Sequence, residues 1–319
     1  MEASPRITTQ PAPDLRDLYR YMASREFVAG RAELLERGFS PHRLRSWKRS
    51  GRLVKAFRGV YSYGREIHTR NAALRAGLLV AGPGSALTGR VALEKWGAIQ
   101  IRREIPLEIQ VATRTDRDRV HNGLSPGLRN TQARVVQRQF EPGDVRLRDG
   151  LEILRPTLAL IDFAVNAPET EVRFAFLELC RLGYFNERDV EFCIRRAVGR
   201  RGSSKLKPLL GLWVTELERI RSVLEGLFLL AWVEAHEEMP EVNVKVHGFE
   251  VDLLWRKQGV VLELDGDAFH SDPIARKRDL RKQRFLESKG LRVIRVTWKE
   301  FMADPAGVVR RIARELGLI

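Results

Sequence analysis

Residues 249–266 read FEVDLLWRKQGVVLELDG, and this stretch decides the fold of the C-terminal third of the chain. Two runs rich in branched and aromatic residues flank the tetrapeptide RKQG, which predicts a β-hairpin. If the loop covers residues 256–259, the register places Asp252 directly opposite Glu263. Because side chains alternate along a strand, Asp265 shares a face with Glu263. The hairpin is therefore predicted to carry three carboxylates on one face.

Like charges that face each other in a sheet are destabilising, and a buried carboxylate is costly unless it is paired. A bound divalent cation reverses the sign of this interaction, and sites built from oxygen ligands suit Mg²⁺ or Mn²⁺. The sequence therefore predicts a metal site formed by Asp252, Glu263 and Asp265. The alternative is that these acids pair with arginines and lysines of the helix expected within residues 271–290.

The chain of 319 residues carries a formal net charge of +15 and has a sequence pI of about 10.4. A surplus of this size is typical of proteins that bind nucleic acid, although an arginine-rich proteome would produce it too. Cys180 and Cys193 have no CxxC or Cys/His partner, which favours buried free thiols over a zinc site. No signal peptide and no run of 18 apolar residues is recognisable, so we expect a cytoplasmic protein without a membrane span.

Residues 15–64 have the order of a winged helix-turn-helix: two helices separated by a glycine turn, then a small hairpin. Between Pro41 and Arg58 the sequence contains seven basic residues and no acidic one. Phosphate contacts supply most of the affinity for DNA, so this bias favours DNA binding over a solvated face, which usually mixes both signs. The seven are Arg43, Arg45, Lys48, Arg49, Arg52, Lys55 and Arg58.

Two further residues near the acidic hairpin are candidates for chemistry. Glu225 follows Ser222 at the spacing of a capping box, so it either caps a helix or adds a fourth acid at the edge of the site. His270 either acts as a general acid or base, or has a structural role. Four residues of the following helix are expected to hold the DNA backbone: Arg278, Arg281, Lys282 and Arg284.

These patterns predict a multidomain protein of the α+β or α/β class. Residues 1–14 are expected to be a disordered lead-in, and residues 15–64 a winged helix-turn-helix domain. Residues 65–198 are expected to form a mixed α/β middle domain. The Gly- and Ser-containing run at 199–211 is interpreted as a linker, and residues 212–319 as an α/β domain with a mixed central sheet.

The C-terminal pattern resembles the very-short-patch-repair endonucleases, which have the PD-(D/E)XK, restriction-endonuclease-like fold. The resemblance covers about residues 215–319 and rests on S-x-x-E, EVDLLW, VVLELDGDAFH, an R/K-D-x-R helix and GLRVIRVTW. It implies that Glu225 matches the helix glutamate of the fold, and Asp252 the central metal-binding aspartate. Glu263 stands at the second acidic position, and His270 matches a downstream active-site histidine.

Two departures from that family limit what the resemblance implies. Asp265 stands where the fold usually has a lysine, so His270, or a second metal held by Asp265, would have to supply the missing role. The Cys/His zinc pattern of the mismatch-repair members is absent from the sequence, so their mismatch specificity is not carried over.

The stretch LLERGFSPHRLRSWKRSGRLVKAFRGVY resembles the N-terminal winged helix of AbiEi-type antitoxins from type IV toxin–antitoxin systems. Residues 65–215 resemble the middle region of the same proteins. This resemblance implies DNA binding and autoregulation.

Together the patterns predict a metal-dependent DNA endonuclease with an N-terminal DNA-binding domain. The alternative is a transcriptional regulator or type IV antitoxin-like protein whose nuclease-like domain is catalytically inert. A third reading is a nuclease that acts on RNA. The sequence identifies neither an oligomeric state nor a toxin or other protein partner.

Overall fold

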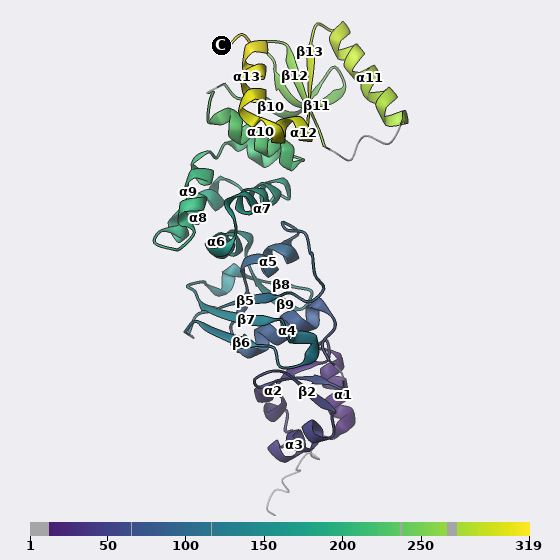
Figure 1. Cartoon of the computed structure of the whole chain (residues 1–319), viewed down its shortest axis with the longest axis vertical. Helices are drawn as coiled ribbons and strands as arrows, with labels where there is room; N and C mark the ends of the chain where they lie inside the picture. The colour runs from purple at the N-terminus through teal and green to yellow at the C-terminus, as the bar shows by residue number, and fades with distance from the viewer. Residues whose placement is uncertain (1–12, 65, 116, 237, 267–272) are drawn as a thin grey trace, which may run out of the picture. The chain divides into compact units, whose positions relative to one another are not determined.

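The computed structural model describes residues 13–319 except for residues 65, 116, 237 and 267–272. The chain divides into two compact units (Figure 1). The first comprises residues 1–96 and 100–159, and the second comprises residues 97–99 and 160–319. In the described part of the chain, no helix combines the length and the apolar character needed to cross a membrane.

The first unit begins with three helices and a three-stranded sheet of order β1-β3-β2. The elements are α1 (Leu15–Ala23), β1 (Val28–Gly30), α2 (Arg31–Glu36), α3 (Pro41–Arg49), β2 (Leu53–Phe57) and β3 (Val60–Tyr63). The Ser40 side chain caps α3 by accepting a hydrogen bond from the backbone N–H of Arg43, and Pro41 occupies the first helical position. Residues 31–63 contain two helices, α2 and α3, followed by the antiparallel pair β2–β3.

The rest of the first unit is a six-stranded sheet of order β6-β7-β5-β4-β9-β8 with two helices and two short 3₁₀ turns. The elements are α4 (Arg70–Ala81), β4 (Ala86–Leu87), α5 (Gly89–Trp96), β5 (Glu108–Thr113), β6 (Arg119–Asn122), η1 (Pro126–Leu128), β7 (Gln132–Gln137), η2 (Pro142–Asp144), β8 (Val145–Arg148) and β9 (Leu151–Leu154). The β5–β7 and β4–β9 pairs are parallel and the remaining pairs are antiparallel. This part is therefore mixed α/β, as the sequence predicts.

A series of helices leads into the C-terminal domain: α6 (Pro156–Asn166), α7 (Glu169–Arg181), α8 (Glu187–Ala197), α9 (Ser203–Gly211) and η3 (Thr215–Arg219). The sequence favours a linker over residues 199–211, but most of this run is the helix α9. Its Leu206, Leu209 and Leu210 are buried, and such burial stabilises a helix that the local Gly and Ser content disfavours. Both cysteines are buried free thiols, as expected.

The C-terminal domain is built on a mixed four-stranded sheet of order β10-β11-β12-β13. Its elements are α10 (Val223–Val233), β10 (Glu241–Val246), β11 (Phe249–Trp255), β12 (Val260–Asp265), α11 (Pro273–Ser288), β13 (Arg292–Thr297), α12 (Trp298–Ala303) and α13 (Pro305–Glu315). The strands β10, β11 and β12 are antiparallel neighbours, and β13 runs parallel to β12. The mixed central sheet expected from the sequence is thus present.

Different helices cover the two faces of this sheet. On one face the Trp255 ring contacts the rings of Phe228 and Trp232 on α10, with centroids 6.3 and 4.9 Å apart. On the other face Leu254 and Val261 pack with Leu286 of α11. Because side chains alternate along β12, its two acids lie on the face of Val261, beneath α11.

Candidate active site

The hairpin β11–β12 has the register that the sequence predicts. Leu253 pairs with Leu262 and Trp255 with Val260, so the loop is residues 256–259. The next position along the ladder sets Asp252 opposite Glu263. There Asp252 Oδ2 accepts a hydrogen bond from the backbone N–H of Leu264 at 2.7 Å, which holds the carboxylate against β12.

All three predicted acids line one cavity of about 180 Å³. The walls of this acidic cavity come from β11, β12, α11 and β13. Its lining residues are Asp252, Glu263, Leu264, Asp265, Asp279, Lys282, Gln283, Leu286, Val293 and Arg295. The four lining residues of α11 are spaced three and four apart, so they occupy one helical face. The helix α11 therefore contributes Lys282 and a fourth carboxylate, Asp279, to the acidic cavity.

The Asp252 carboxyl has a strongly perturbed acidity. Burial raises its pKa to about 7, and the nearby charges of Glu263 and Glu225 raise it as well. The hydrogen bond from Leu264 and the charge of Lys282 act in the opposite direction, but they do not offset the burial. The cavity is lined by four carboxylates and two cationic side chains. Perturbed carboxyls of this kind are common at functional sites.

Lys282 lies inside the cavity and not on the outer surface of α11. Its Nζ is 2.7 Å from Glu263 Oε1, and the two side chains are 21% and 14% exposed. From the sequence, Lys282 is grouped with three arginines that are expected to hold a DNA backbone. Arg278, Arg281 and Arg284 are exposed, but Lys282 is not. Pairing between the strand acids and the following helix, the alternative to metal binding, is therefore present at Glu263.

Asp265 is held by a cation from a neighbouring strand. Arg295 on β13 donates two hydrogen bonds to it, from Nε at 2.8 Å and from Nη2 at 2.7 Å. Arg295 Nη2 also lies 3.7 Å from Asp279 Oδ2. No three His, Cys, Asp or Glu side chains of the described residues are grouped so that they could hold a metal ion. Asp252 and Glu263 are the acids best placed to share one.

We expect Asp265→Asn to destabilise the domain by about 1–2 kcal/mol, because half-buried Arg295 loses a bidentate ionic partner. The free energy of unfolding in urea, measured at pH 7, checks this. Asp279→Asn is the matched control: it removes a carboxylate 3.7 Å from the same guanidinium, and its effect should be under half as large. Equal effects of the two substitutions would contradict the assignment of Asp265 as the main partner.

Glu225 is buried and has a structural role that the sequence only partly predicts. Its backbone N–H donates to Ser222 Oγ at 3.2 Å, which is one half of a capping box. Its Oε2 accepts from the backbone N–H of Arg221 at 2.9 Å and from Asn243 Nδ2 at 2.6 Å. Glu225 does not line the acidic cavity, but its charge contributes to the raised pKa of Asp252.

Sequence reasoning missed two polar residues that position the acids, Arg295 and Asn243. Asn243 has a positive φ of 49°, and the pairs on either side of it in β10 place it beside Asp252. A signal for both was available, because each interrupts a run of β-branched residues. The predicted active-site residue His270 lies outside the described residues.

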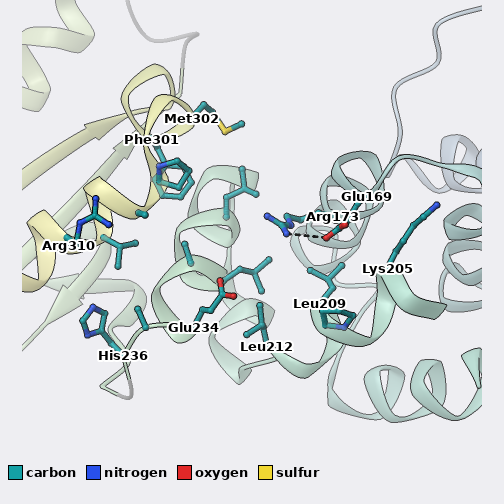
Figure 2. Close-up of a pocket in the computed structure, with 18 of the residues that line it drawn as sticks. Glu169, Arg173, Lys205, Leu209, Leu212, Glu234, His236, Phe301, Met302 and Arg310 are labelled. Atoms are coloured by element: carbon teal, nitrogen blue, oxygen red, sulfur yellow. Dashed lines mark ion pairs between the residues drawn. The ribbon is translucent and has the colours of Figure 1, made fainter. Parts of the chain in front are cut away.

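Figure 2 shows a larger cavity of about 700 Å³ in the second unit. Phe301 and Met302 lie on one side of it, and Leu209 and Lys205 lie on the other. None of the acids predicted from the sequence lines this cavity. Although this cavity is larger than the acidic cavity, it is therefore not the candidate active site.

Comparison with known proteins gives a family match over the C-terminal domain. Residues 231–316 match REase_MTES_1575, a restriction-endonuclease-like family. The match supports a nuclease-like C-terminal domain. It spans the strands that carry Asp252, Glu263 and Asp265, and it leaves Glu225 outside.

The crystal structure of the RV2827C protein from Mycobacterium tuberculosis is 20% identical in sequence, with a TM-score of 0.39, and the similarity covers 70% of this chain and 82% of that one. At this TM-score it supports no conclusion about function. No curated protein matches the sequence significantly.

Proposed function

We propose that the C-terminal domain is a metal-dependent nuclease that hydrolyses phosphodiester bonds in DNA. The observation that carries this proposal is the acidic cavity, where Asp252 and Glu263 face each other and the pKa of Asp252 is raised to about 7. A hard divalent cation with oxygen ligands, Mg²⁺ or Mn²⁺, fits such a donor set. Asp252 and Glu263 would hold it directly, and Asp265, which lines the same cavity, would contribute through water. Glu225 lies outside the cavity and would act on the site only through its charge.

A divalent ion bound there would lower the pKa of a coordinated water and stabilise the charge that develops on the phosphate. The Lys282 ammonium, already next to Glu263, would meet the remaining negative charge of the scissile phosphate. Exposed Arg278, Arg281 and Arg284 on α11 would hold the neighbouring phosphates. His270 keeps its predicted role as a proton shuttle.

We also propose that residues 15–64 bind DNA through α3 and the β2–β3 hairpin. Five of the seven basic residues predicted for this role are exposed: Arg45, Arg49, Arg52, Lys55 and Arg58. The other two have local partners. Arg43 donates a hydrogen bond to the carbonyl of Pro13, and Lys48 Nζ lies 5.7 Å from the centre of the Tyr61 ring.

Replacing Arg45, Arg49 and Arg52 together by alanine should weaken binding to duplex DNA at least tenfold in 100 mM salt. Log affinity falls with log salt concentration, and each lost phosphate contact makes this slope shallower by about 0.9. A salt titration followed by fluorescence anisotropy measures both quantities. Arg20, which is exposed on α1 outside the proposed surface, is the control position, and Arg20→Ala should change the affinity less than twofold.

A DNA-binding regulator with an inert nuclease-like domain is the second candidate. The pairing of Glu263 with Lys282 and of Asp265 with Arg295 favours it, because both acids already have cationic partners. In EDTA, a regulator would give a tight, sequence-specific gel shift on the DNA upstream of its own coding sequence. It would not cleave that DNA when Mg²⁺ is added.

The decisive experiment compares supercoiled plasmid incubated with the full chain in Mg²⁺, in Mn²⁺ and in EDTA. The Asp252→Ala/Glu263→Ala double variant is assayed in parallel. We expect nicking or linearisation that requires the metal and is lost in the double variant. Cleavage that survives in the double variant would refute the site assignment, and absence of cleavage with either metal would favour the regulator. Matched RNA and DNA substrates then distinguish the two nucleic acids.

A further inference from the structure

Two phenylalanine rings lie partly in water on the C-terminal domain. Phe249, at the start of β11, is 36% exposed, and Phe285 on α11 is 39% exposed. Their ring centroids are 5.3 Å apart at an interplanar angle of 53°. A single exposed aromatic residue needs no explanation, but two that contact each other across separate elements form a surface with a defined shape.

The aromatic pair, Phe249 and Phe285, sits on the same two elements that build the acidic cavity. On α11, Phe285 follows Lys282 by three residues, and the Phe249 ring of β11 contacts the Phe285 ring. Residues three apart on a helix are surface neighbours, so Phe285 adjoins the residue that enters the cavity. A strand bound along the aromatic pair would therefore pass close to the acids.

The pair is bordered by positive charge. Arg278 and Arg281 lie seven and four residues before Phe285, so the helical repeat puts both on its flank of α11. Lys289 follows directly after the last residue of the helix. All three are exposed, and Lys289 Nζ is 5.4 Å from the centre of the Phe285 ring. A partner for this surface must therefore combine flat apolar rings with a chain of negative charge.

Unpaired nucleotides have that combination, because bases stack on aromatic side chains while the phosphates meet lysine and arginine. In a duplex the bases are stacked on one another, so the rings would contribute little to binding. We propose that Phe249 and Phe285 form a stacking platform for unpaired bases, and that the substrate is DNA with a single-stranded segment beside the cleaved bond. This inference rests on the proposed nuclease function of the acidic cavity.

The test measures binding of the full chain in EDTA to a fluorescent single-stranded oligonucleotide and to the duplex of the same sequence. Phe285→Leu keeps an apolar side chain but removes the ring, so it should weaken single-strand binding about tenfold or more and change duplex binding less than twofold. Phe285→Tyr retains the ring and should bind both as wild type does. Leu280→Ala removes another exposed apolar side chain of α11, on a different flank, and should change neither.

Binding in EDTA separates this inference from the nuclease proposal. If plasmid is cleaved and Phe285→Leu weakens neither DNA, or weakens both equally, the stacking platform is refuted and the nuclease stands. If neither plasmid nor a duplex with a single-stranded segment is cleaved in Mg²⁺ or Mn²⁺, but Phe285→Leu selectively weakens single-strand binding, the stacking platform stands and the nuclease is refuted. Thermal unfolding of each variant shows whether a loss of binding arises from a loss of folding.

Discussion

Asp252→Asn will lower metal-dependent DNA cleavage by at least about a thousandfold while leaving DNA affinity in EDTA within twofold of wild type. Asparagine has the shape of aspartate, and its amide oxygen can still accept the hydrogen bond from the Leu264 N–H. What it lacks is the negative charge opposite Glu263 that would bind a divalent ion. The measurement is the single-turnover rate of plasmid nicking at saturating Mg²⁺.

The matched control for this substitution is Glu234→Gln, which neutralises an exposed carboxylate in the cavity of about 700 Å³. Its cleavage rate should equal that of wild type. A rate for Asp252→Asn within tenfold of wild type would show that the metal does not depend on this carboxylate. A parallel loss of rate in both variants would point to a general effect of charge.

The same substitution should stabilise the metal-free protein at neutral pH. Burial raises the pKa of Asp252 from 3.8 to about 7, so between these values the native state keeps a proton that the unfolded state releases. The free energy of unfolding therefore falls as the pH rises through this window. In EDTA at pH 8, the free energy of unfolding of Asp252→Asn should exceed that of wild type by on the order of 1 kcal/mol. At pH 4 the two free energies should agree.

Lys282→Met will lower the cleavage rate about a hundredfold, with a smaller effect on DNA affinity. Methionine keeps much of the length of the side chain but removes the ammonium that lies 2.7 Å from Glu263. Without this ammonium, the cavity has one positive charge fewer to neutralise the scissile phosphate. Two measurements check this: the cleavage rate at saturating DNA, and the dissociation constant of the DNA complex in EDTA.

Lys277→Met is the matched control, because Lys277 lies on the same helix but is exposed. It should leave the rate at saturating DNA unchanged. Lys282→Arg keeps the charge and should recover part of the lost rate. If Lys282→Met instead weakened DNA binding tenfold without changing that rate, Lys282 would be a backbone contact, as the sequence alone suggested.

The hairpin shows how far local pattern determines this fold. Alternation of apolar residues sets which side chains of β11 and β12 share a face, and Gly259, with a φ of +65°, permits the tight loop that sets the register. These are short-range effects, so the position of Asp252 opposite Glu263 could be predicted. The capped start of α3 at Ser40 and Pro41 is predictable for the same reason.

The linker expected at residues 199–211 shows where local pattern fails. Its Gly, Ser and Lys content disfavours ordered structure, yet residues 203–211 form α9 because Leu206 and Leu209 are buried against other parts of the second unit. Burial of apolar surface against distant residues outweighs the weak local preference. The sequence of residues 199–211 alone does not show which distant residues bury Leu206 and Leu209.

By itself the sequence determined that three carboxylates share one face of a hairpin, because strand periodicity and loop length are local properties. It did not determine which cation meets which acid. Lys282 reaches Glu263, and Arg295 reaches Asp265, only because α11 packs across the sheet and β13 pairs in parallel with β12. Contacts of this kind depend on how distant elements dock. The charge balance of the acidic cavity is thus a property of the tertiary structure, and the acids themselves are a property of the sequence.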